Sequence, residues 1–186
     1  EKLPYLKSLG VGVLYLNPIV MAFSSHRYDA ADYKRTDPML GTEEDFRLLC
    51  TDAHALGIRV ILDGVFSHTG DHSLYFDSRS VFGGGAVSDP DSPYRSWYLF
   101  KDYPHDYEAW WGIKSLPCVN ELDPGFLDYI IEAEDSVVAY WMEERSYLER
   151  SSLIKNLYMV GGAQKVVMPY LANMGRISEA SKRSKS

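Results

Sequence analysis

Long apolar runs and cysteines are both scarce in this sequence. No apolar run approaches the roughly 20 residues that a membrane-spanning helix needs, so we expect no membrane partner. The two cysteines, Cys50 and Cys118, form neither a disulfide framework nor a zinc pattern, and we expect two buried, reduced thiols. The chain opens with EKLPYLKSLG, without an initiator Met or an apolar leader, so we expect a piece of a longer, cytoplasmic protein.

Basic side chains are also scarce over most of the chain. Residues 1–144 carry 24 acidic and 11 basic side chains, whereas residues 145–186 carry 2 acidic and 8 basic ones and contain no Asp. An acidic body argues against nucleic acid as a partner, because basic surfaces bind nucleic-acid backbones. The basic end could bind phosphate groups, but we expect a divergent, flexible tail whose final SEASKRSKS is of low complexity.

What remains is an alternation of helix and strand patterns typical of a globular α/β domain. We predict a helix over residues 3–9, a strand buried on both faces over 11–18, a helix over 42–56 capped by Thr42, and a second buried strand over 58–62. The strand, helix, strand order predicts two parallel neighbouring strands. Residues 18–41 show no periodicity and are expected to form a long loop.

The second half of the chain is less regular. Residues 69–122 are rich in Gly, Pro, Asp, Ser and aromatic residues, which predicts a small loop-rich subdomain. Asp123 and Pro124 begin a helix that we expect to continue to about Glu144. Residues 151–162 (SSLIKNLYMVGG) are the candidate for a third strand.

This order of elements indicates one of two α/β architectures. The first is a partial (β/α)8 TIM barrel with an irregular subdomain inserted after the strand ending at Asp63, and the second is an open doubly wound sheet. Both place functional side chains at the carboxyl ends of strands, where Asn17 and Asp63 fall.

The segment VILDGVFSHTG (residues 60–70) carries Asp63 and His68 to such a strand end. A carboxylate there can accept hydrogen bonds from sugar hydroxyls, bind a metal or cap a turn. A neutral imidazole donates one hydrogen bond and accepts another, which suits a sugar hydroxyl, although a structural loop histidine is the alternative. His68 and His72 also form an H-x-x-x-H pair, a metal spacing only on a helix, and Gly70 argues against a helix there.

The predicted first loop contains SSHRYDAADY, which mixes aromatic faces with polar groups: His26, Tyr28, Asp32 and Tyr33. Aromatic rings are flat apolar platforms on which the C–H face of a sugar can stack. The alternative is a packed loop whose tyrosines are merely buried.

Three segments in order resemble blocks of one family: HRYDAADYKRTDPMLGTEEDF, LGIRVILDGVFSHTG and SLPCVNELDP. They are similar to the α-amylase superfamily (glycoside hydrolase family 13), and its neopullulanase, cyclomaltodextrinase and maltogenic amylase branch fits best. The resemblance implies that residues 1–68 hold the second and third strands of a catalytic (β/α)8 barrel. Residues 69–122 would then be the inserted subdomain, 123–144 a barrel helix and 145–186 a divergent tail.

The resemblance also implies a substrate site for an α-glucan such as a maltooligosaccharide or cyclodextrin. Tyr28 matches the tyrosine that stacks under the sugar at the cleavage subsite, and Asp63 and His68 match residues that support and contact that sugar. His26 matches a histidine near this subsite. Ser67 stands where many members have an Asn that binds calcium, so we expect no metal and no cofactor.

The chain departs from the family pattern after YWMEE. Members continue into a strand with an Arg and the nucleophilic Asp, but here no G-x-R-x-D and no further Asp occur. A retaining glycosidase needs two carboxyl groups about 5–5.5 Å apart. We therefore expect a fragment of a retaining hydrolase of α-1,4 or α-1,6 glucosidic bonds that is inactive as this chain, because its nucleophile and general acid are absent.

Two alternatives stay open. One is a non-catalytic α-glucan-binding remnant with four aromatic platforms, Tyr28, Tyr33, Trp110 and Trp111. The other is an unrelated α/β enzyme such as a metal-dependent hydrolase. In either case two or three barrel strands cannot close, so we expect exposed sheet edges and aggregation or partial folding of the isolated chain. The sequence indicates no particular oligomeric state.

Overall fold

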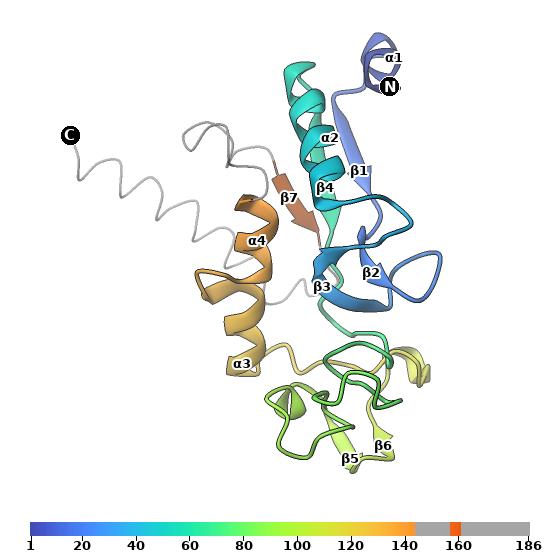
Figure 1. The fold of residues 1–186 in the computed structure, drawn as a ribbon, viewed down its shortest axis with the longest axis vertical. Coiled ribbons are helices and arrows are strands. Elements are labelled where there is room, and N and C mark those ends of the chain that lie inside the picture. Colours follow the sequence, from blue (N-terminus) through green and yellow to red (C-terminus); the bar gives the residue numbers. More distant parts are fainter. Residues whose placement is uncertain (144–156, 161–186) are drawn as a thin grey trace, which may run out of the picture.

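The structure is a computed structural model that describes residues 1–143 and 157–160 (Figure 1). Its elements follow in the order α1 (Leu3–Ser8), β1 (Val13–Leu16), β2 (Val20–Ala22), β3 (Ala30–Thr36), α2 (Glu43–Ala55), β4 (Arg59–Asp63), η1 (Arg95–Trp97), β5 (Phe100–Asp102), β6 (Asp106–Tyr107), η2 (Trp110–Gly112), α3 (Pro124–Leu127), the π-helical turn η3 (Asp128–Glu132), α4 (Val137–Glu143) and β7 (Leu157–Val160). Apart from β7, the predicted tail over residues 145–186 lies outside the described residues.

A parallel three-stranded sheet in the order β1-β4-β7 organises the fold. Leu14 of β1 pairs with Val60 of β4, and Asp63 at the end of β4 pairs with Val160 of β7. The predicted parallel crossover is confirmed, and so is a third strand within residues 151–162. The described strands do not close a barrel, and in Figure 1 the sheet lies above the loop-rich insert, with α3 and α4 alongside.

Helix α2 begins and ends where the sequence predicts. The side chain of Thr42 accepts a hydrogen bond from the N–H of Asp45, whose carboxylate in turn accepts one from the Thr42 N–H, so the first turn is satisfied by a capping box. Gly57 follows the helix with a φ of 66°, a left-handed conformation that suits glycine. The buried side chains Phe46, Cys50 and Ala53 face the core.

The prediction of a long loop over residues 18–41 is wrong in part. Strands β2 and β3 pair antiparallel there, with Val20 opposite Thr36 and Ala22 opposite Ala30. Their register shifts twice within three residues, and β3 carries adjacent charged side chains, so neither strand shows a clean alternation in the sequence. The pairing turns residues 23–29 into a short connection close to the end of β4.

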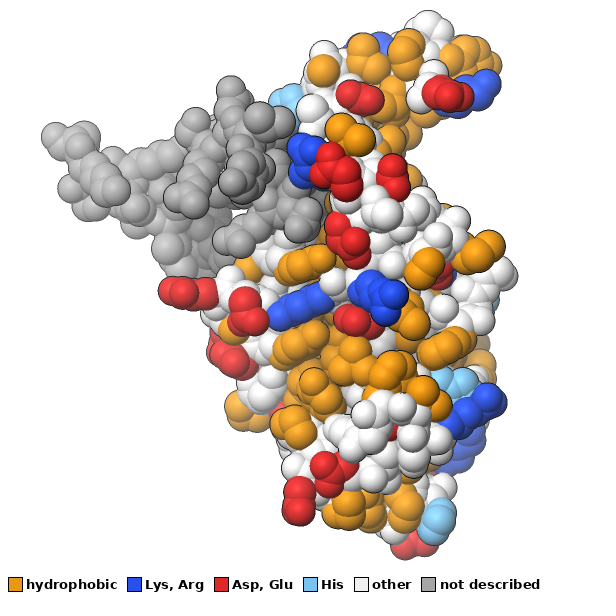
Figure 2. All heavy atoms as spheres, in the orientation of Figure 1, with side chains coloured by type: hydrophobic (Ala, Val, Ile, Leu, Met, Phe, Trp, Pro, Cys, Tyr) orange, Lys and Arg blue, Asp and Glu red, His pale blue; other side chains and the backbone are white. Residues whose placement is uncertain are grey.

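The prediction that the first strand is buried on both faces is also wrong. Val13 and Tyr15 of β1 are 47% and 50% exposed, because among the described elements nothing covers the face on which they lie. Helix α1 adds exposed Tyr5 and Leu9 at the same end of the molecule, where Figure 2 shows hydrophobic side chains gathered around α1. This end of the sheet therefore presents apolar surface to solvent.

The insert after β4 is an irregular structure around an aromatic core, as its composition predicts. The ring of Phe76 lies 4.7 Å from both Tyr98 and Tyr107, edge to face. The chain returns to the end of β4 where the N–H of Val119 donates to the carbonyl of Ser67 at 2.9 Å. The insert thereby holds the segment after β4 in place. Its predicted boundaries, and the domain division as a whole, stay a prediction.

The helix predicted from Asp123 to about Glu144 is not continuous. Asp123 caps α3 through the N–H of Phe126, but a π-helical turn follows and Ala133 is extended, with ψ at 149°. Ser136 then caps α4, its hydroxyl accepting the N–H of Ala139 at 3.2 Å. The apolar pattern of residues 127–141 predicts an inward face: Ile130, Ile131, Val137, Val138 and Trp141 are buried, whereas Leu127 is only partly buried. Within residues 1–143 and 157–160, the helices are all too short or too polar for a bilayer crossing.

Candidate functional site

Tyr28 and Asp63 meet at the carboxyl end of β4. Asp63 is the last residue of that strand, and Tyr28 lies in the connection between β2 and β3. The Tyr28 hydroxyl donates a hydrogen bond to Asp63 Oδ2 at 2.9 Å. The two predicted site residues thus contact each other directly although 35 positions separate them.

Tyr15 is a third member of this group that the sequence analysis missed. It pairs with Ile61 in the parallel ladder, and Ile61 lies on the same face of β4 as Asp63 because side chains alternate along a strand. Burial raises the pKa of Tyr15, and the neighbouring Asp63 carboxylate raises it further. The sequence could have indicated Tyr15, because residues two positions apart lie on the same face of a strand and Tyr15 precedes the predicted functional position Asn17 by two.

The pKa of Tyr28 is raised chiefly by its hydrogen bond to Asp63, with burial as the next cause. Because both phenols titrate above their ordinary value of about 10, Tyr15 and Tyr28 remain neutral near neutral pH. Each therefore presents an uncharged ring near the same carboxylate, and Tyr28 donates its hydroxyl proton to it.

His68 lies deeper than the other predicted residues and is 4% exposed. Its Nδ1 shares a hydrogen bond with the hydroxyl of Ser67 at 3.1 Å, whereas its buried Nε2 has no hydrogen-bond partner within the described ranges. Burial lowers the pKa of the imidazole, and the backbone of Tyr28 and the charge of Asp29 oppose that effect. The site therefore holds a neutral imidazole with one nitrogen uncommitted.

Backbone contacts hold the His68 segment against the Tyr28 segment. The buried hydroxyl of Tyr33 donates to the carbonyl of Val65 at 2.7 Å and lies 3.3 Å from that of His68. The N–H of Gly70 donates to the carbonyl of Ala30 at 3.0 Å. A Cβ on Gly70 would lie 2.8 Å from the carbonyl oxygen of Asp29, so this close approach requires glycine.

His26 lies at the exposed rim beside Tyr28. Its Nδ1 accepts the N–H of Tyr28 at 3.1 Å and contacts the Ser24 hydroxyl at 3.0 Å, and the two rings are 5.9 Å apart. Between them, Arg27 adopts a left-handed φ of 63° and forms an ion pair with buried Asp37 at 2.8 Å. His26 and Arg27 together fix the backbone that presents the Tyr28 ring.

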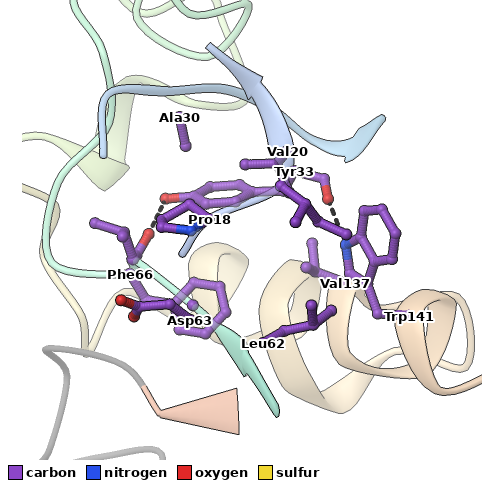
Figure 3. Close-up of a pocket in the computed structure, with 12 residues that line it drawn as sticks. Pro18, Val20, Ala30, Tyr33, Leu62, Asp63, Phe66, Val137 and Trp141 are labelled. Atoms are coloured by element: carbon purple, nitrogen blue, oxygen red, sulfur yellow. Dashed lines mark hydrogen bonds between the residues drawn. The ribbon is translucent and has the colours of Figure 1, made fainter. Parts of the chain in front are cut away.

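A small pocket lies behind Asp63, between β3, β4 and α4 (Figure 3). The Tyr33 ring lies across it, and the Tyr33 carbonyl accepts a hydrogen bond from the indole of Trp141. A volume of about 20 Å³ admits roughly one water molecule and excludes a sugar ring. The expectation that Tyr33 is a sugar platform is therefore wrong, because this ring is 2% exposed and belongs to the core.

As Gly70 indicates, the H-x-x-x-H pair of His68 and His72 has no helix to support it, since residues 68–72 form a bridge and a turn. His72 Nδ1 instead contacts the Ser78 hydroxyl at 3.0 Å. Within residues 1–143 and 157–160, no group of three or more His, Cys, Asp or Glu side chains could hold a metal ion. Of the two free thiols, Cys50 is buried as expected, whereas Cys118 is only half-buried.

The family of the alpha-amylase catalytic domain matches residues 1–147 of this chain. An amylopullulanase of Thermoanaerobacterium thermosulfurigenes is 44% identical over 155 residues, covering 76% of this chain and 8% of that protein. Neopullulanase 2 of Thermoactinomyces vulgaris is 36% identical over 151 residues, covering 77% of this chain and 24% of that protein. The chain thus spans less than a quarter of the length of these relatives.

Solved structures agree with the sequence matches. The cyclic α-maltosyl-(1→6)-maltose hydrolase of Arthrobacter globiformis, in complex with that cyclic sugar, is 34% identical with a TM-score of 0.62, covering 76% of this chain and 31% of the other. The type III pullulan hydrolase of Thermococcus kodakarensis is 31% identical with a TM-score of 0.67, and the match covers 86% of this chain and 31% of the other. The chain therefore belongs to the α-amylase family of catalytic domains, glycoside hydrolase family 13.

Proposed function

We propose that this chain forms one wall of the substrate site of a retaining glycoside hydrolase acting on α-glucans. Tyr28, Asp63 and His68 would bind the sugar at the cleavage position, with His26 at the rim. The observation that carries this proposal is the Tyr28–Asp63 hydrogen bond of 2.9 Å beside a buried imidazole nitrogen without a partner. The three lie in the segments that match the family.

The chemistry of these side chains suits an uncharged sugar. The neutral ring of Tyr28 offers an apolar face, and the hydrogen bond to Asp63 restrains its rotation. A buried nitrogen without a partner is costly, and a sugar hydroxyl at His68 Nε2 would remove that cost. The relatives named above are an amylopullulanase, a neopullulanase, a cyclic α-maltosyl-(1→6)-maltose hydrolase and a pullulan hydrolase, which supports an α-glucan as the ligand class.

The chain supplies the wall but not the cleaving carboxylates. Hydrolysis with retention needs a nucleophile and an acid about 5–5.5 Å apart. Asp63 already binds Tyr28, and no Asp follows Asp135 in this sequence. We propose that β1, β4 and β7 correspond to consecutive strands of a (β/α)8 barrel, that the cleaving residues belong to later strands, and that these 186 residues alone do not hydrolyse glucan.

A titration with maltoheptaose, followed by amide chemical shifts and by reducing-sugar release, tests the proposal. We expect shifts at Tyr28, Asp63 and His68 at millimolar ligand, and no release of reducing sugar. Asp63→Asn should weaken binding by about tenfold, because a neutral amide oxygen is a weaker hydrogen-bond acceptor than a carboxylate. Asp135→Asn is the matched control, since that carboxylate is 89% exposed.

Two results would contradict the proposal in different ways. Absence of any shift at millimolar maltoheptaose would mean that these residues do not form a sugar site. Turnover at an enzymatic rate that Asp63→Asn abolishes would mean that the chain contains its own cleaving carboxylates.

The alternative of a non-catalytic glucan-binding remnant rests on the aromatic rings of Tyr28, Trp110 and Trp111, since buried Tyr33 offers no platform, and it likewise predicts binding without release of reducing sugar. The coding DNA on both sides of codon 145 separates the two. An in-frame G-x-R-x-D strand nearby supports the hydrolase, and a natural stop without one supports the remnant.

A further inference from the structure

Trp111 combines two unusual properties for a tryptophan. It is 87% exposed, and its backbone is left-handed, with φ 53° and ψ 25°. A bulky side chain rarely occupies that conformation, and such strained residues cluster at functional sites. The proposed sugar wall around Tyr28 makes no use of Trp111, so its placement needs a separate explanation.

The exposed indole of Trp111 packs against a neighbouring aromatic ring on one face. Its ring stacks on Trp110 with a centroid distance of 5.3 Å and an interplanar angle of 27°. Trp110 in turn lies 5.3 Å from the ring of His68. The three rings form a series that runs outward from buried His68 to exposed Trp111.

Backbone hydrogen bonds fix the turn that carries these rings. The N–H of Trp110 donates to the carbonyl of Leu116 at 2.9 Å, and the N–H of Ile113 donates to the carbonyl of Trp110 at 2.9 Å. Gly112, the next residue, is also left-handed, with a φ of 77°. In Figure 1 the η2 turn lies at the edge of the insert opposite α3 and α4.

We propose that Trp111 is the stacking platform of an outer subsite that binds a second glucosyl unit of the same α-glucan chain. This inference rests on the proposed function, because it places the inner unit at Tyr28, Asp63 and His68. Two observations carry it: the exposed indole on a left-handed backbone, stacked on Trp110, and the unpartnered Nε2 of His68 at the inner end of the ring series.

The rings of Trp110 and Trp111 carry no formal charge. No cation lies over the ring of Trp110 or Trp111 among the described residues, where the cation–π contacts involve Phe and Tyr rings. An indole face exposed in this way binds the C–H face of a sugar ring by dispersion and by release of water. A protein partner is the competing occupant, and it is an outcome of the test below.

The test compares a long ligand with a short one on the intact 186-residue chain. Binding of maltoheptaose and of glucose is followed by chemical shifts, including the indole N–H signals. Trp111→Ala should weaken maltoheptaose binding about five- to tenfold, because one ring stack is lost, and should leave glucose binding unchanged. Trp111→Phe, which keeps a flat ring, should restore most of the affinity.

Tyr5→Ala is the matched control, since Tyr5 is 60% exposed on α1 and should change neither ligand's affinity. If Trp111→Ala leaves maltoheptaose affinity unchanged while Asp63→Asn weakens it, the outer subsite is wrong and the proposed function stands. If Trp111→Ala changes only the sedimentation behaviour, the indole is a protein contact and the sugar subsite is wrong. If the unmodified chain binds neither sugar, both proposals fail together.

Discussion

Asp63 and His68 occupy different electrostatic environments although they lie five residues apart. The Asp63 carboxylate is half-buried and accepts a hydrogen bond from the Tyr28 hydroxyl. The His68 imidazole is buried, and its lowered pKa favours the uncharged form. At the residue scale the proposed site therefore pairs a carboxyl group that accepts a hydrogen bond from Tyr28 with a neutral imidazole.

His68 makes stability depend on pH with a defined sign. Its pKa is lower in the folded than in the unfolded chain, so the unfolded chain binds more protons between the two values. The free energy of unfolding should therefore fall as the pH falls below about 6.5, the ordinary histidine value, until the folded pKa is passed. Urea unfolding of the chain and of His68→Gln at pH 7 and pH 5 measures this.

The difference in free energy of unfolding between the unmodified chain and His68→Gln reports on His68 alone, because the acidic side chains are common to both. The contribution of His68 to the free energy of unfolding should be present at pH 7 and smaller at pH 5. An equal loss of stability in the chain and in His68→Gln would contradict the assignment.

At the scale of elements, the site depends on two connections that approach each other closely. The connection between β2 and β3 carries Tyr28, and the connection after β4 carries His68. The two approach each other most closely where Gly70 lies against the Asp29 carbonyl. The insert reinforces this contact through the N–H of Val119 on the Ser67 carbonyl. Neither connection has a hydrophobic periodicity of its own, so hydrogen bonds between backbones determine the geometry.

Gly70→Ala should damage both stability and the site. The added Cβ would lie 2.8 Å from the Asp29 carbonyl oxygen, so the two connections must separate. We expect the free energy of unfolding to fall by about 1–3 kcal/mol, as for other overpacked positions. Tyr28 amide and ring signals should shift at the same time. Denaturant unfolding and chemical shifts provide the two measurements.

Gly84→Ala is the matched control, because a Cβ at Gly84 meets no atom within 4 Å. Its effect on the free energy of unfolding should stay within about 0.5 kcal/mol. If Gly70→Ala changes the free energy of unfolding no more than Gly84→Ala does, the close approach at Gly70 does not position Tyr28.

At the scale of the whole molecule, the sheet is only partly covered. Among the described strands, β1 pairs with β4 alone, and Val13 and Tyr15 face solvent beside exposed Tyr5 and Leu9 of α1. Exposed strand edges and apolar faces promote association between chains. The matching segment makes up only 24% of neopullulanase 2 and 8% of the amylopullulanase, so both relatives contain additional sequence outside it.

The isolated chain should therefore self-associate. A charged side chain on the uncovered face of β1 should reduce this self-association. Val13→Lys adds a cation to a side chain that is 47% exposed. Sedimentation velocity over a concentration series should show less association for Val13→Lys than for the unmodified chain. Val81→Lys, at an insert position that is 72% exposed, is the control and should not change association. A monomeric unmodified chain with a cooperative thermal transition would contradict this prediction.

Much of the regular structure could be predicted from the sequence because its causes are local. Thr42 and Asp45 cap α2, Gly57 ends it, and apolar runs mark β1, β4 and the inward face of α3 and α4. The parallel pairing of β1 with β4 follows from the crossover between them. The family also follows from three local segments, which is why sequence alone identified it.

Only the tertiary structure decided where side chains from separate segments meet. The antiparallel pairing of β2 with β3 and the burial of Tyr33 depend on partners far along the chain, as does the position of Tyr15 beside Asp63. The ring series from His68 to Trp111 likewise joins a strand end to a turn in the insert. Periodicity reports which face of an element is apolar, but contact between distant segments is determined by packing and by backbone hydrogen bonds, which leave no local pattern.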